Sequence, residues 1–432
     1  MESKSNMVKK ICKEEVEVPL FSIEAKCQTL TPMIMSGANK ESFELREPSI
    51  KGLLRFWWRA FAGKQDTATL FQREAELFGS TEKASAFRVT ISDANPTITQ
   101  PGHTPQNVGW GNGIQYLLFS ILELNSQNHT YYTRRSFAKA GLQFTLKLSG
   151  FKEESQVKEI LKALWLASIL GGLGSRSRRG AGSFEVTNLK IYKKGWEKDR
   201  ILVEIEGAPD FFCFKNKNSL EEIKRAFLQE LKKVLPRPIP QGLPDFTVFS
   251  KDQSSFYLFS GSLPTSTIDL WNTLGAKIKE ERKIKPQEDA QALHNYADKI
   301  KGVTTPGAPP GVWQKHAFGL PIIYNFKEDF GNIHSQNLGI TLKASVYEIS
   351  REKQITETRR ASPLFISIHS NHNGKYFAIL SLLWSQFIDP NNYQLKWEWL
   401  RGRENEDLGS GHIPDDPRFI RQVLKNIGAI PV

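Results

Sequence analysis

The sequence predicts an α+β protein whose first half has the ferredoxin-like (RRM-like, βαββαβ) arrangement of a four-stranded sheet and two helices. Three observations support this. Apolar residues alternate with polar ones in four short segments, they recur at helical spacing in two longer segments, and these six segments follow the order β-α-β-β-α-β. Many unrelated activities share this fold, so any function has to be argued from particular residues.

The first elements are a strand and two helices. Alternating apolar residues predict a half-buried strand over 21–29. A helix over 49–62 follows, because Pro48 restricts the entry to it, Ser49 can cap it, and apolar residues then recur at helical spacing. A second, shorter helix is expected over 70–78, closed by Gly79.

The remaining elements of the first half are separated by a long insertion. Alternation at 87–91 predicts the second strand, and the segment 93–113 is rich in Pro, Thr, Asn and Gly, which is typical of a loop. The apolar segment 114–124 is ambiguous between helix and strand. The third strand, the second main helix and the fourth strand are expected at 142–148, 155–170 and 184–191.

The second half predicts another domain with strands and inserted helices, and we place the boundary near 210, giving domains 1–210 and 211–432. An amphipathic helix is expected over 219–235, and two further helical stretches precede a breaker-rich cluster at 302–311. Strands are expected at 321–326, 338–349 and 363–369, and helices at 377–387 and 417–427.

The composition excludes a membrane-embedded protein, since the mean hydropathy is −0.40. The N-terminus has no apolar segment typical of a secretory signal, so we expect a cytoplasmic protein. Three cysteines without a CxxC pattern support neither a disulfide framework nor a thiolate zinc site. The net charge of +12 favours a polyanionic partner, although a basic solvated surface without any partner carries the same charge.

The turn from Gly171 to Ser183 is the clearest candidate for binding such a partner. Its sequence, GGLGSRSRRGAGS, places three arginines among five glycines with no acidic residue nearby. Glycines let backbone N–H groups approach a phosphate, and guanidinium groups bind phosphate oxygens in pairs. The turn lacks the Walker A lysine and follows a helix instead of opening one, so it predicts contact with an RNA backbone and no nucleotide cofactor. The structural alternative is a helix C-cap followed by a flexible turn.

The helix over 49–62 is the second candidate. Lys51, Arg55 and Arg59 are spaced four residues apart, which places them along one face as a basic ridge. Trp57 or Trp58 offers a ring on which an unpaired base can stack, although a tryptophan at helical spacing more often belongs to the core.

These motifs resemble a known family. ELREPSIKGLLRFWWRAF with the later LFGS, the Gly/Arg turn and RRASPLFISI at 359–368 are similar to the first RAMP subunit of the type III-B CRISPR effector, the Cmr complex. The resemblance implies two ferredoxin-like RAMP domains with inserted loops and helices. It also implies a subunit that contacts CRISPR RNA near its 3′ end, target single-stranded RNA and the other subunits of the complex. RNA contacts are then expected at Arg46, Lys51, Arg55, Trp58, Arg59, Arg176, Arg178, Arg179 and Arg360.

The main alternative is a metal-independent RAMP ribonuclease, which needs a positioned acid and base, commonly histidine. The eight histidines are scattered outside the two basic segments, and only His316, His369 and His372 merit a test. HxxH at 369–372 is a weak metal signal without a nearby carboxylate, so we expect no metal and no cofactor. A third alternative is a scaffold that binds acidic protein neighbours. We expect an RNA-binding subunit without catalysis of its own.

Overall fold

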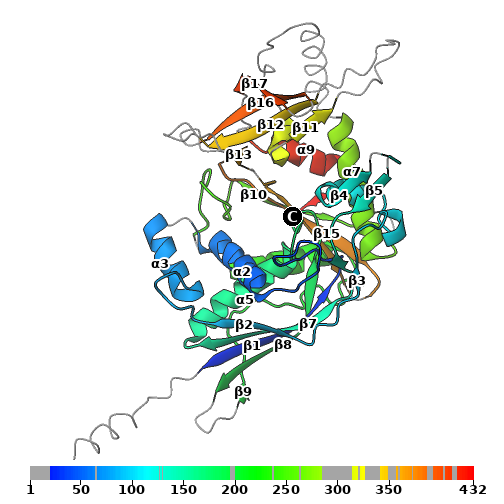
Figure 1. Cartoon of the computed structure of the whole chain (residues 1–432). Coiled ribbons are helices and arrows are strands. Elements are labelled where there is room, and N and C mark those ends of the chain that lie inside the picture. Colours follow the sequence, from blue (N-terminus) through cyan, green and yellow to red (C-terminus); the bar gives the residue numbers. More distant parts are fainter. Residues whose placement is uncertain are drawn as a thin grey trace, which may run out of the picture.

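The computed structural model describes residues 20–63, 66–125, 127–128, 130–194, 200–235, 238–261, 264–284, 314–319, 322–325, 341–348, 357–358, 361–371, 373–386, 393–401, 404–410 and 416–432. Within these residues lie three larger antiparallel sheets and two short hairpin-like pairs of strands (Figure 1). No helix of the described part is long and apolar enough to cross a membrane.

The first sheet is formed by all four strands predicted for the first half and one more. It contains β1 (Phe21–Thr29), β2 (Arg88–Ser92), β7 (Gln143–Phe151), β8 (Phe184–Lys194) and β9 (Arg200–Leu202), in the spatial order β2-β7-β1-β8-β9. Every pairing is antiparallel, and β1 lies in the middle between β7 and β8. Its alternating residues are buried on one face, as the period of two requires.

Helices α2 (Glu47–Ala62) and α5 (Glu154–Ile169) cover that face of the sheet, and α3 (Thr67–Phe78) packs against α2 (Figure 1). The expected capping of α2 by Ser49 is wrong: the helix begins two residues earlier, its N-cap is Arg46, and no side chain caps it. Similarly, α5 begins at Glu154 with a capping box formed by Glu153 and Gln156.

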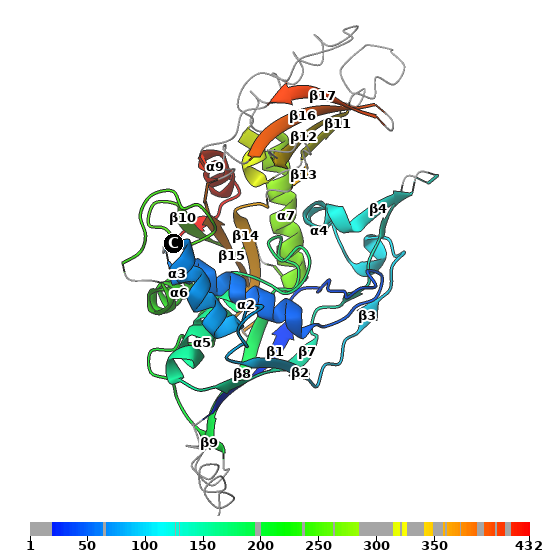
Figure 2. The same ribbon diagram turned by 60° about the vertical axis from the view of Figure 1, so that its left-hand side comes forward.

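The insertion between β2 and β7 is more ordered than a loop. It contains β3 (Ile98–Thr99), α4 (Asn112–Leu117), β4 (Leu122–Asn125), β5 (Thr130–Thr133) and β6 (Phe137–Ala138), with short 3₁₀ turns at Gln106–Val108 and Phe119–Ile121. The ambiguous segment 114–124 is therefore part helix and part strand, because α4 ends at Leu117 and a strand begins five residues later. Helix α4 packs along α7 (Thr267–Ile284), as Figure 2 shows.

The second sheet has the strand order β14-β15-β10-β18, formed by β10 (Ser254–Phe259), β14 (Leu364–Ser370), β15 (Tyr376–Leu383) and β18 (Ile430–Pro431). Helix α7 follows β10 in the chain, and α9 (Arg418–Asn426) precedes β18. In chain order these elements again read β-α-β-β-α-β, with the same spatial arrangement of strands as the core of the first sheet.

The expected helix over 377–387 is wrong, since this segment forms strand β15 and the coil after it. The run FAILSLL is apolar on both faces because β15 is central, between β10 and β14, and all seven residues are buried. A continuous apolar run has no period that separates a buried strand from a buried helix.

A third sheet is inserted into the second half. It contains β11 (Ile322–Asn325), β12 (Thr341–Glu348), β16 (Tyr393–Arg401) and β17 (Glu404–Ser410), with β13 (Glu357–Thr358) paired to β12. The amphipathic helix predicted over 219–235 is α6 (Leu220–Val234), whose Ser219 and Glu222 form a capping box. Its apolar face packs into the same core as α5, beside the first sheet.

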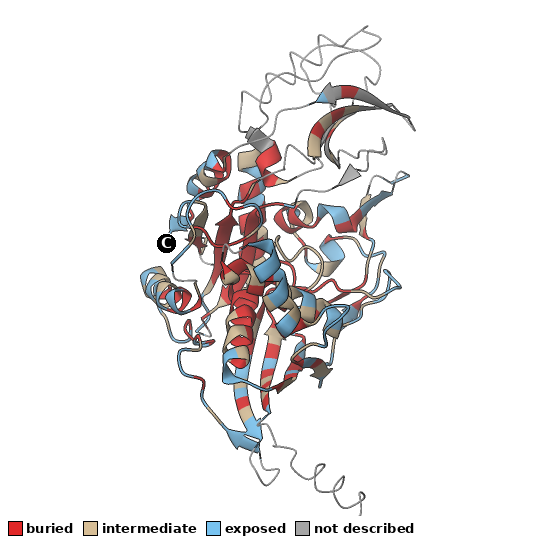
Figure 3. Ribbon diagram, turned by 90° about the vertical axis from the view of Figure 1, so that its left-hand side faces the viewer, coloured by how far each residue is buried: buried red, intermediate tan, exposed pale blue. Residues whose placement is uncertain are grey.

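Two buried clusters form the core, and the first joins the two halves of the chain. It contains residues of the first sheet together with Leu258, Phe365, Phe377, Ile379 and Leu383 of the second. Figure 3 shows buried residues concentrated where the helices meet the sheets. At the seam, Arg179 of the Gly/Arg turn forms a parallel β-bridge with Ile366 of β14.

Candidate functional site

A pocket of about 440 Å³ lies at the front of the Gly/Arg turn. Four segments form it: the chain after β1, the N-terminal half of α2, the connection between β5 and β6, and the turn itself. It is lined by Ile34, Met35, Ser36, Gly37, Lys40, Ser49, Leu53, Arg135, Gly172, Gly174, Ser175 and Ser177. The volume is in the range of small-molecule sites.

Glycine is required where the turn crosses the segment after β1. Gly174 has φ +86°, and a Cβ there would lie 2.3 Å from the carbonyl oxygen of Ile34. Next to it, the Ser175 N–H donates to the same Ile34 carbonyl over 2.7 Å. Further along, the Leu173 N–H donates to the Gly182 carbonyl over 2.8 Å. The turn is thus fixed against the pocket wall, and the alternative of a flexible turn does not describe it.

The polar lining of the pocket suits an anion. Lys40 and Arg135 carry the charge, four serines supply hydroxyl donors, and the Arg135 Nη1 lies 3.4 Å from Ser175 Oγ. The N-terminal end of α2, which no side chain caps, adds a partial positive charge beside Ser49. No carboxylate lines the pocket; Glu44 lies beside Gly37 and pairs with Arg46 over 3.6 Å. Ile34, Met35 and Leu53 provide an apolar wall for a base or a ribose.

The three arginines of the turn point to different neighbours. Arg178 donates from Nη1 to the Ser362 carbonyl over 2.7 Å and lies 4.5 Å above the ring of Phe365, so it joins the two halves. Arg179 donates from Nη2 to the Phe318 carbonyl over 3.3 Å. Burial, together with the charges of Arg282, Arg176 and Arg178, lowers the pKa of Arg179 to about 10. Arg176 has φ +62° and also lies close to Arg179.

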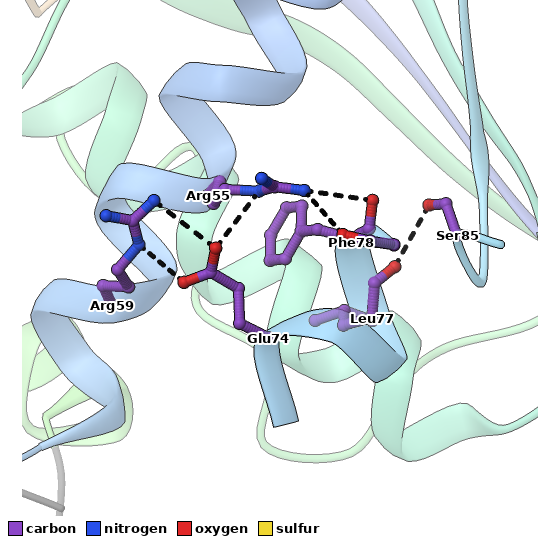
Figure 4. Close-up of polar contacts among 7 residues, drawn as sticks. Arg55, Arg59, Glu74, Leu77, Phe78 and Ser85 are labelled. Carbon is purple, nitrogen blue, oxygen red and sulfur yellow. Dashed lines mark hydrogen bonds and ion pairs between the residues drawn. The ribbon is translucent and has the colours of Figure 1, made fainter. Parts of the chain in front are cut away.

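The predicted basic ridge of α2 meets α3 (Figure 4). Arg59 Nε lies 2.7 Å and Arg55 Nε 3.4 Å from the carboxylate of Glu74. Arg55 also donates from Nη2 to the carbonyls of Phe78 and Gly79, at the C-terminal end of α3. The ridge therefore holds α3 against α2.

Lys51 and Arg46 flank this ridge. The Lys51 ammonium lies 5.1 Å from the centre of the Phe87 ring, and its pKa is lowered by burial and by the charge of Arg55. The Arg46 side chain is half-buried and pairs with Glu44. The assignment of Lys51, Arg55, Arg59 and Arg46 as RNA contacts stays a prediction.

Trp58 does not offer a surface for stacking a base. Its side chain is fully buried, and its indole N–H donates to Glu159 over 2.6 Å. Phe78 packs edge-on against the ring, and the Arg73 guanidinium lies 5.6 Å from the ring centre. The helical spacing of Trp58 marks a core residue, the alternative stated from the sequence. Arg360 lies outside the described residues.

Of the three histidines singled out from the sequence, His316 and His369 are in the core. His369 shares a hydrogen bond of 2.9 Å with the Ile169 carbonyl and stacks on Phe377. Burial lowers the pKa of His369 to about 4 and that of His316 to about 3, so both are neutral. His372 lies outside the described residues.

The pocket brings in two cations that the sequence reasoning missed. Lys40 is in the segment after β1, and Arg135 is in the insertion between β5 and β6. Neither belongs to a motif, and they lie 95 positions apart in the sequence. The sequence does contain one signal, the pair Arg134–Arg135 in an insertion otherwise poor in charge. It indicates a site only once the fold places Arg135 against the turn.

Comparison with known proteins decides the family. Residues 26–185, which include the end of β1, all of α2 and the whole Gly/Arg turn, match the RAMP superfamily. The chain is 31% identical over 193 residues to the Cmr subunit Cmr1-2 of Pyrococcus furiosus, covering 40% of this chain and 96% of that protein. This chain belongs to the Cmr1 family of RAMP proteins.

Two further matches agree with membership of the Cmr1 family. Cmr1-1 of P. furiosus is 28% identical over 220 residues, which are 50% of this chain and 57% of that subunit. The crystal structure of Cmr1 from P. furiosus in its apo form matches with a TM-score of 0.52 at 18% identity, covering 95% of this chain and 98% of that one. This likeness supports the mixed α+β fold across both halves.

Proposed function

We propose that the chain is an RNA-binding subunit of a type III-B CRISPR (Cmr) RNA-guided RNA-silencing complex. In this role it binds CRISPR RNA near its 3′ end, target single-stranded RNA, or both, and it contacts the other Cmr subunits in the cytoplasm. The observation that carries the proposal is the pocket, where Lys40, Arg135, four hydroxyl groups and the uncapped α2 terminus face one cavity with no carboxylate in its lining. The Cmr1 relatives support the assembly.

The chemistry of the pocket fits one nucleotide of a single strand. Its charged side binds phosphate oxygens, because guanidinium, ammonium and serine hydroxyl groups are the usual phosphate contacts. Its apolar wall packs against a ribose or base without reading the sequence. Binding is then strongly dependent on salt and tolerant of sequence.

The proposed role includes no catalysis by this chain. A ribonuclease that works without metal needs an acid and a base that reach the 2′-hydroxyl and the leaving group. His369 and His316 are buried and neutral, and His369 is engaged by a backbone carbonyl. These features support a binding role over the alternative of a CRISPR RNA-processing endoribonuclease, which predicts cleavage of labelled RNA in EDTA.

We also infer that each half is a ferredoxin-like RAMP domain. Two features support the inference: each half reads β-α-β-β-α-β in chain order, and each has its second, third, first and fourth strands adjacent in that spatial order. The insertion at 93–138 and the third sheet are then additions to a repeated unit.

A binding assay with matched variants tests the proposal. The full chain is titrated into labelled single-stranded RNA, and fluorescence anisotropy is read over a salt series. Replacing Lys40 and Arg135 by glutamine raises Kd about tenfold and lowers the salt slope by roughly 1.4, since each phosphate contact on a single strand contributes ~0.7. The control replaces Lys147 and Lys190, two exposed lysines on the open face of the first sheet, and removes the same charge. Equal effects in both double variants would reject the pocket as the RNA site.

A further inference from the structure

A second cluster of cations lies where the Gly/Arg turn meets α4 and α7. Arg282, near the end of α7, lies 4.5 Å above the ring of Phe318, and Arg179 of the turn donates to the carbonyl of the same residue. Arg282 also donates from Nη1 to the hydroxyl of Tyr116 in α4. The turn, α4, α7 and the short 3₁₀ helix Gln314–Phe318 thus meet at two guanidinium groups.

One nitrogen of each guanidinium group lacks an acceptor, although both residues are partly exposed. Arg179 Nη1 and Arg282 Nε are inaccessible to water, and neither has a hydrogen-bond partner in the described structure. No described carboxylate pairs with either arginine; the nearest acidic residue in sequence, Glu281, accepts from Asn426. A buried donor without an acceptor is costly, and more so when it is charged. The cluster therefore has the composition of an anion site whose anion is supplied from outside the chain.

The cluster is placed to continue the strand held by the pocket. Ser177 lines the pocket, and Arg179 lies two residues later in the same tight turn, in which the Gly180 N–H donates to the Ser177 carbonyl. Arg176 and Arg282 both lie near enough for their charges to lower the pKa of Arg179. A strand that crosses the turn passes from one group of cations to the other.

We propose that Arg179 and Arg282 together bind a second phosphate group of the RNA strand, next to the nucleotide held in the pocket. This inference rests on the proposed function and adds Arg282, with Tyr116 as the residue that positions it. Guanidinium groups suit this task because each presents two parallel donors to one phosphate.

The test compares Arg282→Gln with Arg421→Gln, which removes the same charge from α9, where Arg421 donates to the Asp252 carbonyl. With single-stranded RNA of about ten nucleotides, Arg282→Gln raises Kd three- to tenfold and lowers the salt slope by ~0.7. With a dinucleotide, which fills the pocket alone, Arg282→Gln binds like the unaltered chain. Arg421→Gln changes neither quantity.

Other outcomes separate the failures. If Arg282→Gln matches Arg421→Gln on the longer RNA while Lys40→Gln with Arg135→Gln still weakens binding, this inference is wrong and the proposed function survives. If neither set of variants weakens RNA binding, both fail. Arg282→Lys guards against misfolding, because it keeps the positive charge while removing the planar guanidinium group, and it retains the salt slope but not the full affinity. A lower Tm with unchanged RNA binding would make Arg282 purely structural. Loss of binding to other Cmr subunits alone would assign the cluster to a protein partner.

Discussion

Glu74 shows how one carboxylate decides the role of two arginines. Its side chain is mostly buried and receives both Arg55 and Arg59, whereas Lys40 and Arg135 face a pocket that no carboxylate lines. Side chains with the same formal charge therefore differ in whether they are available to bind a ligand. The paired arginines neutralise a mostly buried acid and hold α3, while the pocket cations remain available to phosphate.

Replacing Glu74 by glutamine separates these roles. The variant leaves Arg55 and Arg59 without their counter-charge, so we expect the free energy of unfolding to fall by roughly 1–3 kcal/mol. Urea unfolding followed by circular dichroism measures the loss. RNA affinity stays constant if the two arginines serve α3 alone. A rise in affinity after Glu74→Gln would show that the freed arginines bind RNA and would support the prediction made from their spacing.

At the scale of elements, local pattern predicted most of the first half and failed where burial removed the pattern. Strand β1, helix α2 and helix α3 follow from alternation, helical spacing and Gly79, since each has one exposed and one buried face. Strand β15 has no exposed face, so its apolar run does not distinguish a strand from a helix, and the helix predicted there is wrong. The Gly/Arg turn was recognised by composition, but the pocket in front of it depends on Lys40 and Arg135, which only the tertiary fold brings to it.

The conformation of the turn can be tested with Gly174→Ala. A Cβ there combines an unfavourable positive φ with a clash against the Ile34 carbonyl. We expect a loss of stability of roughly 2–4 kcal/mol, or a displaced turn with weaker RNA binding. Gly102→Ala is the matched control, because Gly102 has φ +90° and open space around its Cα, so only the backbone term of about 1 kcal/mol applies. Equal losses in thermal denaturation would mean that the close contact at Ile34 does not matter.

At the scale of the whole molecule, the two halves share one core and the Gly/Arg turn contacts the second half. Arg178 and Arg179 tie the turn to β14, and His369 of β14 is bonded to the Ile169 carbonyl at the end of α5. Phe214 and Phe377 pack on the same imidazole. Because the RNA contacts proposed here come from both halves, any loosening of the seam is expected to alter binding as well as stability.

The seam makes global stability depend on pH. The pKa of His369 is about 4 in the folded protein, lowered by burial, against about 6.5 in an unfolded chain. Between these values the unfolded chain binds a proton that the folded chain does not, so stability is complete above pH 6.5 and falls as the pH decreases toward 4. At pH 5 the expected loss from His369 is about 2 kcal/mol relative to pH 7. His316, with a folded pKa of about 3, adds to the loss in the same direction.

Urea unfolding at pH 5, 6 and 7 measures the slope. His369→Phe is less stable at pH 7, because the Ile169 carbonyl loses its hydrogen-bond donor. Its free energy of unfolding changes less with pH, because the contribution of His369 is absent. If the free energy of unfolding of His369→Phe changed with pH as much as that of the unaltered chain, neutral His369 would not hold the two halves together.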